Sequence, residues 1–340
     1  MTSKVVTNAA LFIALAASFN LAMSQNQPAQ PPAAAPGAPP AGPPRSVPDP
    51  RVQQRTYLFA DTNEQLPYAL FVSSKVTKSK SAPLIVSLHG LGGTQNTMVG
   101  ERLKTIELAE QGGYIFVAPM GYNCGGWYGM PLGRPPGAGA PGTAPGNGAV
   151  PAGARPGGPP TGAAPAMPPQ GGPPPAGAPR AGGPPRGAGG FGNMACNGGG
   201  TAVTDAAKVR ELSEKDVLNV LELVRKEFNI DERRIYLMGH SMGASGTLYL
   251  GAKYPAIWAA IAADAPPGAP NADGIAAAKI PTLIIQGDAD TAVPVAGTRR
   301  YVERLKELNA DYKYIEIPGL DHSIAGIPDM YEWFAKHTRK

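Results

Sequence analysis

The chain has 340 residues, of which 44 are glycine and 39 are proline, and its formal net charge is +5 at pH 7. Most of the excess positive charge falls in one Pro/Gly-rich stretch, at Arg134, Arg155, Arg180 and Arg186. Because this charge is sparse and is not gathered on a folded surface, it argues against a nucleic-acid-binding protein.

Residues 1–24 have the features of a secretory signal. Lys4 precedes an apolar run from residue 9 to residue 21, and the small residues Ala22 and Ser24 occupy positions −3 and −1 of a cleavage site. The run is too short and too rich in alanine for a stable transmembrane span, although an uncleaved anchor stays open as an alternative. We therefore expect a secreted or periplasmic protein with no stable membrane insertion after cleavage.

Two segments have compositions that do not support a hydrophobic core. Residues 25–50 read as a Pro-rich linker, and the insert at 131–190 carries 18 prolines and 18 glycines without the regular glycine spacing of collagen. Both are predicted to be disordered, and weak contact of the cationic insert with anionic envelope material is expected. About 230 residues remain, which is enough for one domain that spans 51–340 and is interrupted by the insert.

The two cysteines, Cys124 and Cys196, stand on either side of the insert. In an exported protein this placement favours a disulfide that closes the base of the insert. Two separate thiols are the alternative.

Apolar periodicity predicts alternating strands and helices in the rest of the chain. Strands are expected at 55–60, 66–72, 82–88, 114–119, 234–238, 258–263, 282–286 and 312–317. Helices are expected at 98–111, 213–228, 244–253, 295–308 and 327–336. The first two strands form a hairpin, and the later alternation predicts an α/β fold with a mostly parallel sheet flanked by helices.

The sequence Gly239-His240-Ser241-Met242-Gly243 lies between a predicted strand and a predicted helix. This is the context that a nucleophile elbow requires, and the glycines permit the sharp turn that exposes the serine hydroxyl. A structural Gly-Ser turn is the alternative. The context favours Ser241 as a nucleophile.

A serine nucleophile needs a base and a carboxylate that orients the base. His322 follows the last predicted strand, downstream of the serine, where we expect the base. The acid is expected in the turn from Gly287 to Pro294, where Asp288 and Asp290 are both available, and Asp321 is a further competitor.

Acyl transfer also needs donors for an oxyanion. The backbone amides of Met242, directly after the nucleophile, and of Leu91, in a Gly-rich loop after the third predicted strand, are the candidates. Tyr122, Trp127 and Tyr128 follow the fourth predicted strand, and they form either an aromatic wall of a substrate pocket or packing under the insert.

The motifs Leu88-His89-Gly90-Leu91-Gly92-Gly93, Gly239 to Gly243 and Gly287 to Pro294, in this order behind a signal peptide, resemble α/β-hydrolases. They are similar to those of the secreted esterase family of polyhydroxybutyrate depolymerases and feruloyl esterases, and related prolyl-oligopeptidase-like serine hydrolases share the pattern. The resemblance favours Asp290 over Asp288 as the acid. It also implies a serine carboxylesterase that acts on small-molecule or polymer esters without a metal or an organic cofactor.

The chain departs from this pattern in two places. Its acid turn reads Gln286-Gly287, where many relatives have His-Gly, and His322 follows an aspartate where a glycine is common. Two other functions stay open. The first is a serine peptidase of the prolyl-oligopeptidase type, and the second is a non-catalytic surface-binding protein on a hydrolase scaffold.

Overall fold

The computed structural model describes residues 47–131, 198–268 and 272–340. Residues 1–46 and 132–197 lie outside the described residues. They include the whole predicted signal segment 1–24, the predicted linker 25–50 except its last four residues, and the predicted insert 131–190 except its first residue. Their assignments remain predictions.

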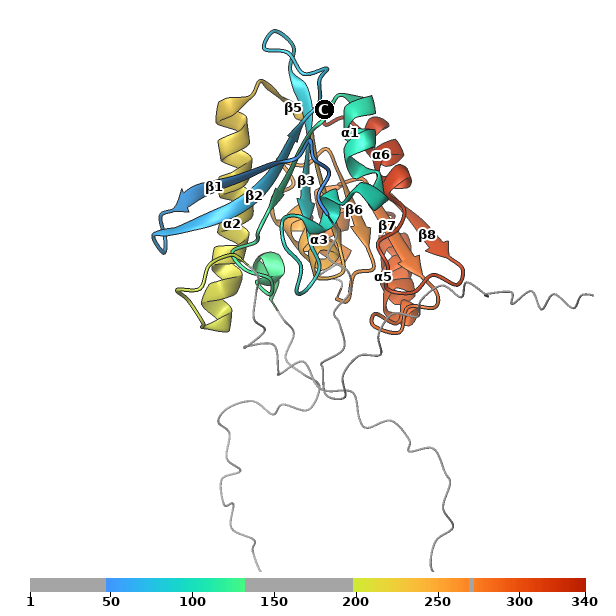
Figure 1. The fold of residues 1–340 in the computed structure, drawn as a ribbon. Helices are drawn as coiled ribbons and strands as arrows, with labels where there is room; N and C mark the ends of the chain where they lie inside the picture. Colours follow the sequence, from blue (N-terminus) through green and yellow to red (C-terminus); the bar gives the residue numbers. More distant parts are fainter. Residues whose placement is uncertain (1–46, 132–197, 269–271) are drawn as a thin grey trace, which may run out of the picture. The chain divides into compact units, whose positions relative to one another are not determined.

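The described residues form one sheet of eight strands in the order β1-β2-β4-β3-β5-β6-β7-β8 (Figure 1). The strands are β1 (Gln53–Phe59), β2 (Glu64–Val72), β3 (Ala82–Leu88), β4 (Ile115–Pro119), β5 (Ile230–His240), β6 (Ala260–Asp264), β7 (Thr282–Gly287) and β8 (Tyr312–Ile317). β1 and β2 form the predicted antiparallel hairpin, and β2 is also antiparallel to β4. From β4 to β8 all neighbours are parallel, which confirms the predicted mostly parallel sheet.

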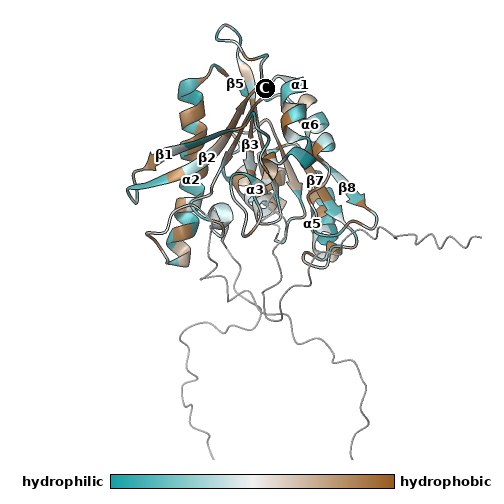
Figure 2. Cartoon of the chain, viewed as in Figure 1, coloured by the Kyte–Doolittle hydropathy of each residue, from teal (hydrophilic) through white to brown (hydrophobic). Residues whose placement is uncertain are grey.

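Helices cover both faces of this sheet. In the described residues they are α1 (Thr105–Gly112), α2 (Ala206–Glu227), α3 (Met242–Lys253), α4 (Ala272–Ala278), α5 (Val295–Glu307) and α6 (Ile327–Ala335). Leu84 and Val86 of β3 pack in the core on the side of α2, α3 and α5, whereas Ile85 packs in the core on the side of α1 and α6. Figure 2 shows the central strands mostly hydrophobic and the helices hydrophobic on part of their surface only, as this burial pattern requires. No helix within the described ranges combines the length and apolarity needed to cross a bilayer.

Three helix predictions are corrected by the structure. The segment predicted as a helix at 98–111 consists of two short 3-10 turns and α1, because Gly100 is extended and Lys104 has a left-handed φ of 58°. Helix α2 begins at Ala206 and not at 213, since the Asp205 side chain accepts a hydrogen bond from the Lys208 amide at 2.8 Å and caps the helix there. Helix α4 follows β6, in a segment for which the apolar periodicity predicts no helix.

The sheet order also indicates where a site can form. The chain moves outward from β3 to β4 on one side and from β5 to β8 on the other, so the connections diverge beyond the carboxyl ends of β3 and β5. Crevices at such a switch point are the usual position of ligand sites in open α/β sheets.

Candidate active site

Ser241 lies at this switch point, between the end of β5 and the start of α3. Its φ of 56° and ψ of −122° place it in a backbone conformation that is unfavourable for a residue with a side chain. A methyl group on Gly243 would come within 2.2 Å of the Leu88 carbonyl oxygen, and one on Gly239 within 2.3 Å of the Gly243 carbonyl oxygen. The two glycines therefore allow α3 to start directly against β3, which the sharp turn at Ser241 requires.

The structure brings Ser241, His322 and Asp290 together in one hydrogen-bonded chain. The Nε2 atom of His322 lies 2.9 Å from the Ser241 Oγ atom, and its Nδ1 atom lies 2.7 Å from the Asp290 Oδ2 atom. These residues come from the ends of β5, β7 and β8, which are separated in sequence but end at the same edge of the sheet. The arrangement can transfer a proton from the serine hydroxyl to the imidazole while the carboxylate orients the ring.

The two competing acids lie elsewhere. Asp288 is exposed and accepts a hydrogen bond from the Gly319 amide at 2.6 Å, as a turn-capping carboxylate does. Asp321 is exposed and accepts the hydroxyl of Ser323. Among the described residues, neither of these carboxylates forms a hydrogen bond with His322.

The Asp290 carboxylate is fully surrounded by donors. Its Oδ1 atom accepts the amides of Ala292 and Val293 at 2.9 and 2.8 Å, and its Oδ2 atom accepts the Nε2 donor of Gln286 at 3.0 Å. Burial by itself would raise the pKa of Asp290, but the Val293 amide and the His322 ring, followed by the Ala292 amide, hold this pKa below its ordinary value of 3.8. The Asp290 carboxylate therefore stays ionised at neutral pH.

Gln286 is a contributor to the site that sequence reasoning noted only as a departure from the family pattern. Its side chain is fully buried, donates to Asp290 and to the Val293 carbonyl at 3.1 Å, and accepts the Thr298 hydroxyl at 3.0 Å. The side-chain amide of Gln286 thus bonds to two residues of the turn, Asp290 and Val293, and to Thr298 of α5, and these bonds fix the shape of the turn. The signal in the sequence that could have identified it is a glutamine at the end of a predicted buried strand, four residues before Asp290.

The loop after β3 carries the Leu91 amide close to Ser241. A methyl group on Gly90 would lie 3.2 Å from the Cβ atom of Ser241, so the Gly90–Leu91 peptide passes directly beside the serine. The Gly90 carbonyl oxygen lies 2.7 Å from the Nδ1 atom of His89 and accepts the Gly93 amide at 3.0 Å. Because the carbonyl and the N–H of a trans peptide point in opposite directions, these contacts direct the Leu91 N–H away from His89. No acceptor within residues 47–131, 198–268 and 272–340 pairs with the amide of Leu91 or of Met242.

His89 is buried, and its other ring nitrogen lies 2.8 Å from the Met120 carbonyl oxygen. Burial lowers the pKa of His89, although the two carbonyl contacts oppose this shift. The imidazole thus joins the loop after β3 to the segment after β4. Sequence reasoning left His89 without a role.

The aromatic residues after β4 mostly lie in the interior. Tyr122 and Tyr128 are fully buried, and Trp127 is half-buried against the main core. The hydroxyl of Tyr128 donates to the His89 carbonyl at 3.1 Å, and Cys124 accepts the Gly92 amide through its carbonyl at 2.8 Å. Tyr128 therefore supports the loop after β3 from within, whereas Tyr122 packs against Phe59 and donates its hydroxyl to Glu64. Neither tyrosine forms an open wall, and a substrate contact of Trp127 stays a prediction.

Cys124 is buried and is not a free thiol. Its predicted partner Cys196 lies outside the described residues. The pairing of these two cysteines stays a prediction.

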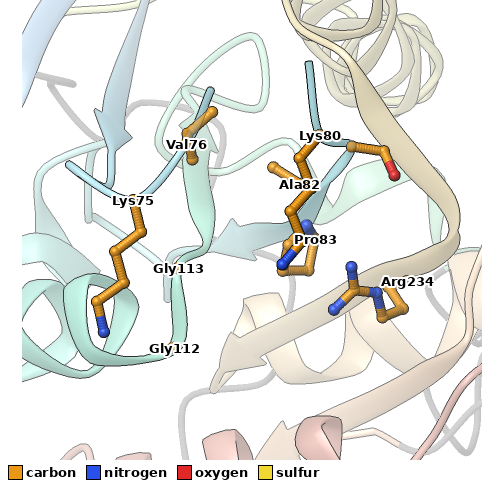
Figure 3. A pocket seen from close by; sticks show the side chains of 9 residues that line it. Lys75, Val76, Lys80, Ala82, Pro83, Gly112, Gly113 and Arg234 are labelled. Atoms are coloured by element: carbon orange, nitrogen blue, oxygen red, sulfur yellow. The ribbon is translucent and has the colours of Figure 1, made fainter. Parts of the chain in front are cut away.

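A separate pocket opens at the opposite edge of the sheet (Figure 3). Its volume is about 140 Å³, and its lining includes Lys75, Lys80, Pro83 and Arg234. Lys75 already donates to the Gln111 carbonyl, and Arg234 is paired with Asp231. Since Arg234 precedes the end of β5 by six residues, this pocket lies roughly 20 Å from Ser241 and takes no part in the site. In the described portion of the chain, no group of three metal-binding side chains is present.

Comparison with protein families shows a match of residues 209–336 to the family model described as PET hydrolase-like. The matched segment contains Ser241, Asp290 and His322. Cutinase 2 of Thermobifida cellulosilytica is 36% identical over 100 residues, which are 29% of this chain and 37% of that enzyme. A cutinase of Thermobifida fusca is likewise 36% identical over 100 residues and is matched over 30% of its length. The chain thus matches only about a third of the length of these relatives.

Solved structures resemble the chain over most of its length. The ferulic acid esterase of Anaeromyces mucronatus aligns with a TM-score of 0.53 and 17% identity, over 84% of this chain and 90% of that one. The S-formylglutathione hydrolase of Agrobacterium tumefaciens aligns with a TM-score of 0.54 and 15% identity, over 84% and 94%. The chain has the α/β-hydrolase fold. The comparisons confirm both this predicted fold and the predicted resemblance to esterases that share it.

Proposed function

We propose that this protein is an exported serine carboxylesterase that acts through an acyl-enzyme intermediate, with Ser241 as nucleophile, His322 as general base and acid, and Asp290 as the orienting acid. The observation that carries the proposal is the hydrogen-bonded chain from Ser241 Oγ through both nitrogens of His322 to Asp290, at 2.9 and 2.7 Å. Its donors and acceptors are in the order that nucleophilic acyl transfer requires.

In the proposed reaction, Ser241 Oγ attacks the ester carbonyl carbon while His322 Nε2 takes the serine proton. The carbonyl oxygen becomes an oxyanion, which the amides of Leu91 and Met242 stabilise. The loop after β3 and the N-terminus of α3 supply these two donors, and a pair of donors that converges on the oxyanion lowers the barrier by several kcal/mol.

The tetrahedral intermediate then collapses. The bond between the carbonyl carbon and the leaving oxygen breaks, and His322 gives its proton to that oxygen, so that an alcohol leaves and the acyl group stays on Ser241. Water next attacks the acyl-enzyme with His322 as base, which releases the carboxylic acid and restores the serine. The proposed chemistry needs only side chains and amides of this chain together with water.

The substrate class is also a proposal. The similarity to cutinases and to PET hydrolase-like proteins supports esters in general and makes polyesters worth testing beside small soluble esters. Export to the periplasm or the medium is supported by the residues of the segment 1–24 and suits an enzyme that meets polymeric substrates.

Labelling with a fluorophosphonate probe, combined with hydrolysis of p-nitrophenyl acetate, tests the proposal. The expected result is one probe per chain, found on the peptide that contains Ser241, together with ester turnover that labelling abolishes. Ser241→Ala serves as the control and should give neither. Labelling accompanied by cleavage of peptide p-nitroanilides and no ester turnover would instead favour a peptidase. Absence of both labelling and turnover would favour a non-catalytic protein.

A further inference from the structure

A second imidazole–carboxylate pair, His240 and Asp264, lies beside the proposed triad. The Nδ1 atom of His240 is 2.9 Å from the Asp264 Oδ2 atom, and the two residues are only 6% and 1% exposed. They are the last residues of the neighbouring parallel strands β5 and β6, and the strand register places them opposite each other. The pair is therefore at the same edge of the sheet as Ser241.

Asp264 contacts both the nucleophile elbow and the loop that carries His322. Its carbonyl oxygen accepts the Ser241 amide at 2.8 Å, and its Oδ2 atom accepts the Ala325 amide at 3.1 Å in addition to His240. Ala325 follows His322 by three residues in the same loop. The loop that carries the base is thus held by carboxylates at two points, at His322 by Asp290 and at Ala325 by Asp264.

The ring of His240 completes this arrangement. Its centroid lies 4.9 Å from that of the His322 ring at an interplanar angle of 43°. A methyl group on Gly90 would lie 3.5 Å from the His240 Cδ2 atom, so His240 fills the space between the loop after β3 and the ring of the base. The imidazole of His240 consequently limits how far the ring of His322 can move toward the loop after β3.

The hydrogen bonds of Asp264 are asymmetric. Both side-chain bonds go to Oδ2, whereas Oδ1 is buried and has no hydrogen-bond partner among the described residues. A buried polar atom without a partner is unfavourable for folding, so stability alone does not account for a carboxylate here.

We propose that Asp264, together with His240, is a positioning residue that holds the loop of the base against the nucleophile elbow, so that His322 Nε2 stays within hydrogen-bond reach of Ser241 Oγ. This inference rests on the proposed function of Ser241 and His322. A displacement of about 1 Å between catalytic groups lowers rates by roughly 100-fold, which sets the scale of the expected effect.

Two substitutions of Asp264 distinguish the loss of its side-chain hydrogen bonds from the loss of its charge. Asp264→Asn can keep its carbonyl oxygen at the Oδ2 position and accept both donors, with its nitrogen at the unpartnered Oδ1 position. Asp264→Ala removes both bonds. We expect Asp264→Ala to lower kcat on p-nitrophenyl acetate by about 100-fold with KM changed less than threefold, and Asp264→Asn to keep kcat within about fivefold of the parent.

Tyr331→Phe is the matched control, because it removes another buried side-chain hydrogen bond, from the Tyr331 hydroxyl in α6 to the Thr105 carbonyl of α1 at 2.9 Å, and leaves the hydrogen bonds of Asp264 in place. It should lower the temperature of unfolding without lowering kcat. If Asp264→Ala does not fold, Asp264→Ser replaces it, since a serine hydroxyl is too short to reach both donors and is expected to give the same loss of kcat.

Two further readouts do not depend on esterase activity. The rate of fluorophosphonate labelling should fall with kcat in Asp264→Ala, and hydrogen exchange at the Ala325 amide should speed up in Asp264→Ala but not in Asp264→Asn. The proposal is overturned if Asp264→Ala keeps parental kcat, labelling and exchange, or if Asp264→Asn is as impaired as Asp264→Ala. A parent that labels rapidly but hydrolyses no ester would refute the proposed substrate class and leave the labelling and exchange tests of Asp264 valid.

Discussion

The backbone of Ser241 adopts φ and ψ angles that cost on the order of 1–3 kcal/mol. The turn is held by the Ser241 carbonyl, which accepts the Ala244 and Ser245 amides at 2.9 and 3.1 Å, and by the Ser241 amide, which donates to Asp264. These bonds fix the hydroxyl in front of His322 before any substrate binds. At the scale of single residues, the proposed site is therefore preorganised for the transfer of the serine proton that the proposed mechanism requires.

Substitutions of the three hydrogen-bonded residues Ser241, His322 and Asp290 should lower kcat far more than substitutions of residues beside them. We expect Ser241→Ala and His322→Ala to lower kcat on p-nitrophenyl acetate by about 10⁴-fold or more, since each removes a group that takes part in bond making. Asp290→Asn should cost about 10³- to 10⁴-fold, because an amide no longer selects the correct tautomer of the ring.

Asp288→Asn is the matched control for Asp290→Asn. Asp288 lies two residues away and caps a turn through the Gly319 amide, so its substitution should change kcat by less than fivefold. An active Asp290→Asn together with an inactive Asp288→Asn would show that the acid is Asp288.

At the scale of elements, the start of α3 depends on Gly243. A methyl group there would overlap the carbonyl oxygens of Leu88 and His89, at 2.2 and 2.7 Å, and backbone atoms cannot move aside as a flexible side chain can. We expect Gly243→Ala to destabilise the fold by about 3 kcal/mol or more, as other strained core substitutions do, and to abolish ester hydrolysis. Urea unfolding followed by circular dichroism measures the first effect.

Gly297 provides the control for this prediction. It lies within α5 and has no atom within 4 Å of the position of an added methyl group. Gly297→Ala should therefore stabilise the protein by roughly 0.5–1 kcal/mol, because alanine loses less backbone entropy in a helix. A stabilising Gly243→Ala would contradict the close approach of α3 and β3.

The attachment of α2 to the segment after β4 should depend on pH. Asp216 of α2 is fully buried and accepts the Tyr57 hydroxyl and the Gly121 and Tyr122 amides at 2.6, 2.6 and 3.0 Å. Burial raises the pKa of Asp216 from 3.8 to about 6, although these three donors oppose the shift. Between pH 4 and pH 6 the folded state thus binds more protons at this site than the unfolded state, and its contribution to stability falls as the pH rises through this window.

Asp216→Asn tests this dependence, because asparagine does not titrate. As the pH rises from 4 to 7, the free energy of unfolding of the parent should fall relative to that of the variant by about 2–3 kcal/mol. Other titrating groups are common to both proteins and cancel in the difference. Urea unfolding at pH 4, 5, 6 and 7 gives this quantity, and a difference that stays constant with pH would contradict the assigned pKa direction.

At the scale of the whole molecule, the chain leaves and re-enters the described fold at neighbouring points. The Gly200 amide donates to the Tyr122 carbonyl at 2.5 Å, and the Thr201 and Ala202 amides donate to Glu64 at 2.6 and 2.9 Å. These contacts hold residues 200–202, which follow the insert in sequence, against Tyr122 after β4 and against Glu64 of β2. The fold on either side of the insert is thus joined independently of the insert itself.

Deletion of residues 131–190 should leave this fold intact, because the entropy of closing a loop changes only with the logarithm of its length. We expect kcat/KM for p-nitrophenyl acetate to stay within a few-fold of the parent, since none of the proposed catalytic or oxyanion residues lies in the insert. Activity on polymer films or retention on anionic envelope material is expected to change more. A deletion variant that does not fold or has no turnover of small esters would show that the insert is a structural part of the site.

The order and type of most elements and the positions of the motifs follow from the local pattern of residues along the chain. Continuous apolar runs such as 82–88 and 282–286 coincide with β3 and β7, because a strand that is buried on both faces needs apolar residues at nearly every position. The strand–Gly-His-Ser-Met-Gly–helix context gave the elbow, since only such a turn needs two glycines at these positions.

Which side chains meet across the sheet follows only from its three-dimensional arrangement. The burial of Tyr122 and Tyr128, the contact of His89 with Met120, and the contacts of Asp264 with His240 and Ala325 all join segments that are far apart in sequence. Local periodicity reports which face of an element is buried, but it carries no distance between elements. A carboxylate such as Asp264 is therefore indistinguishable from a solvated one until β5 and β6 are placed side by side.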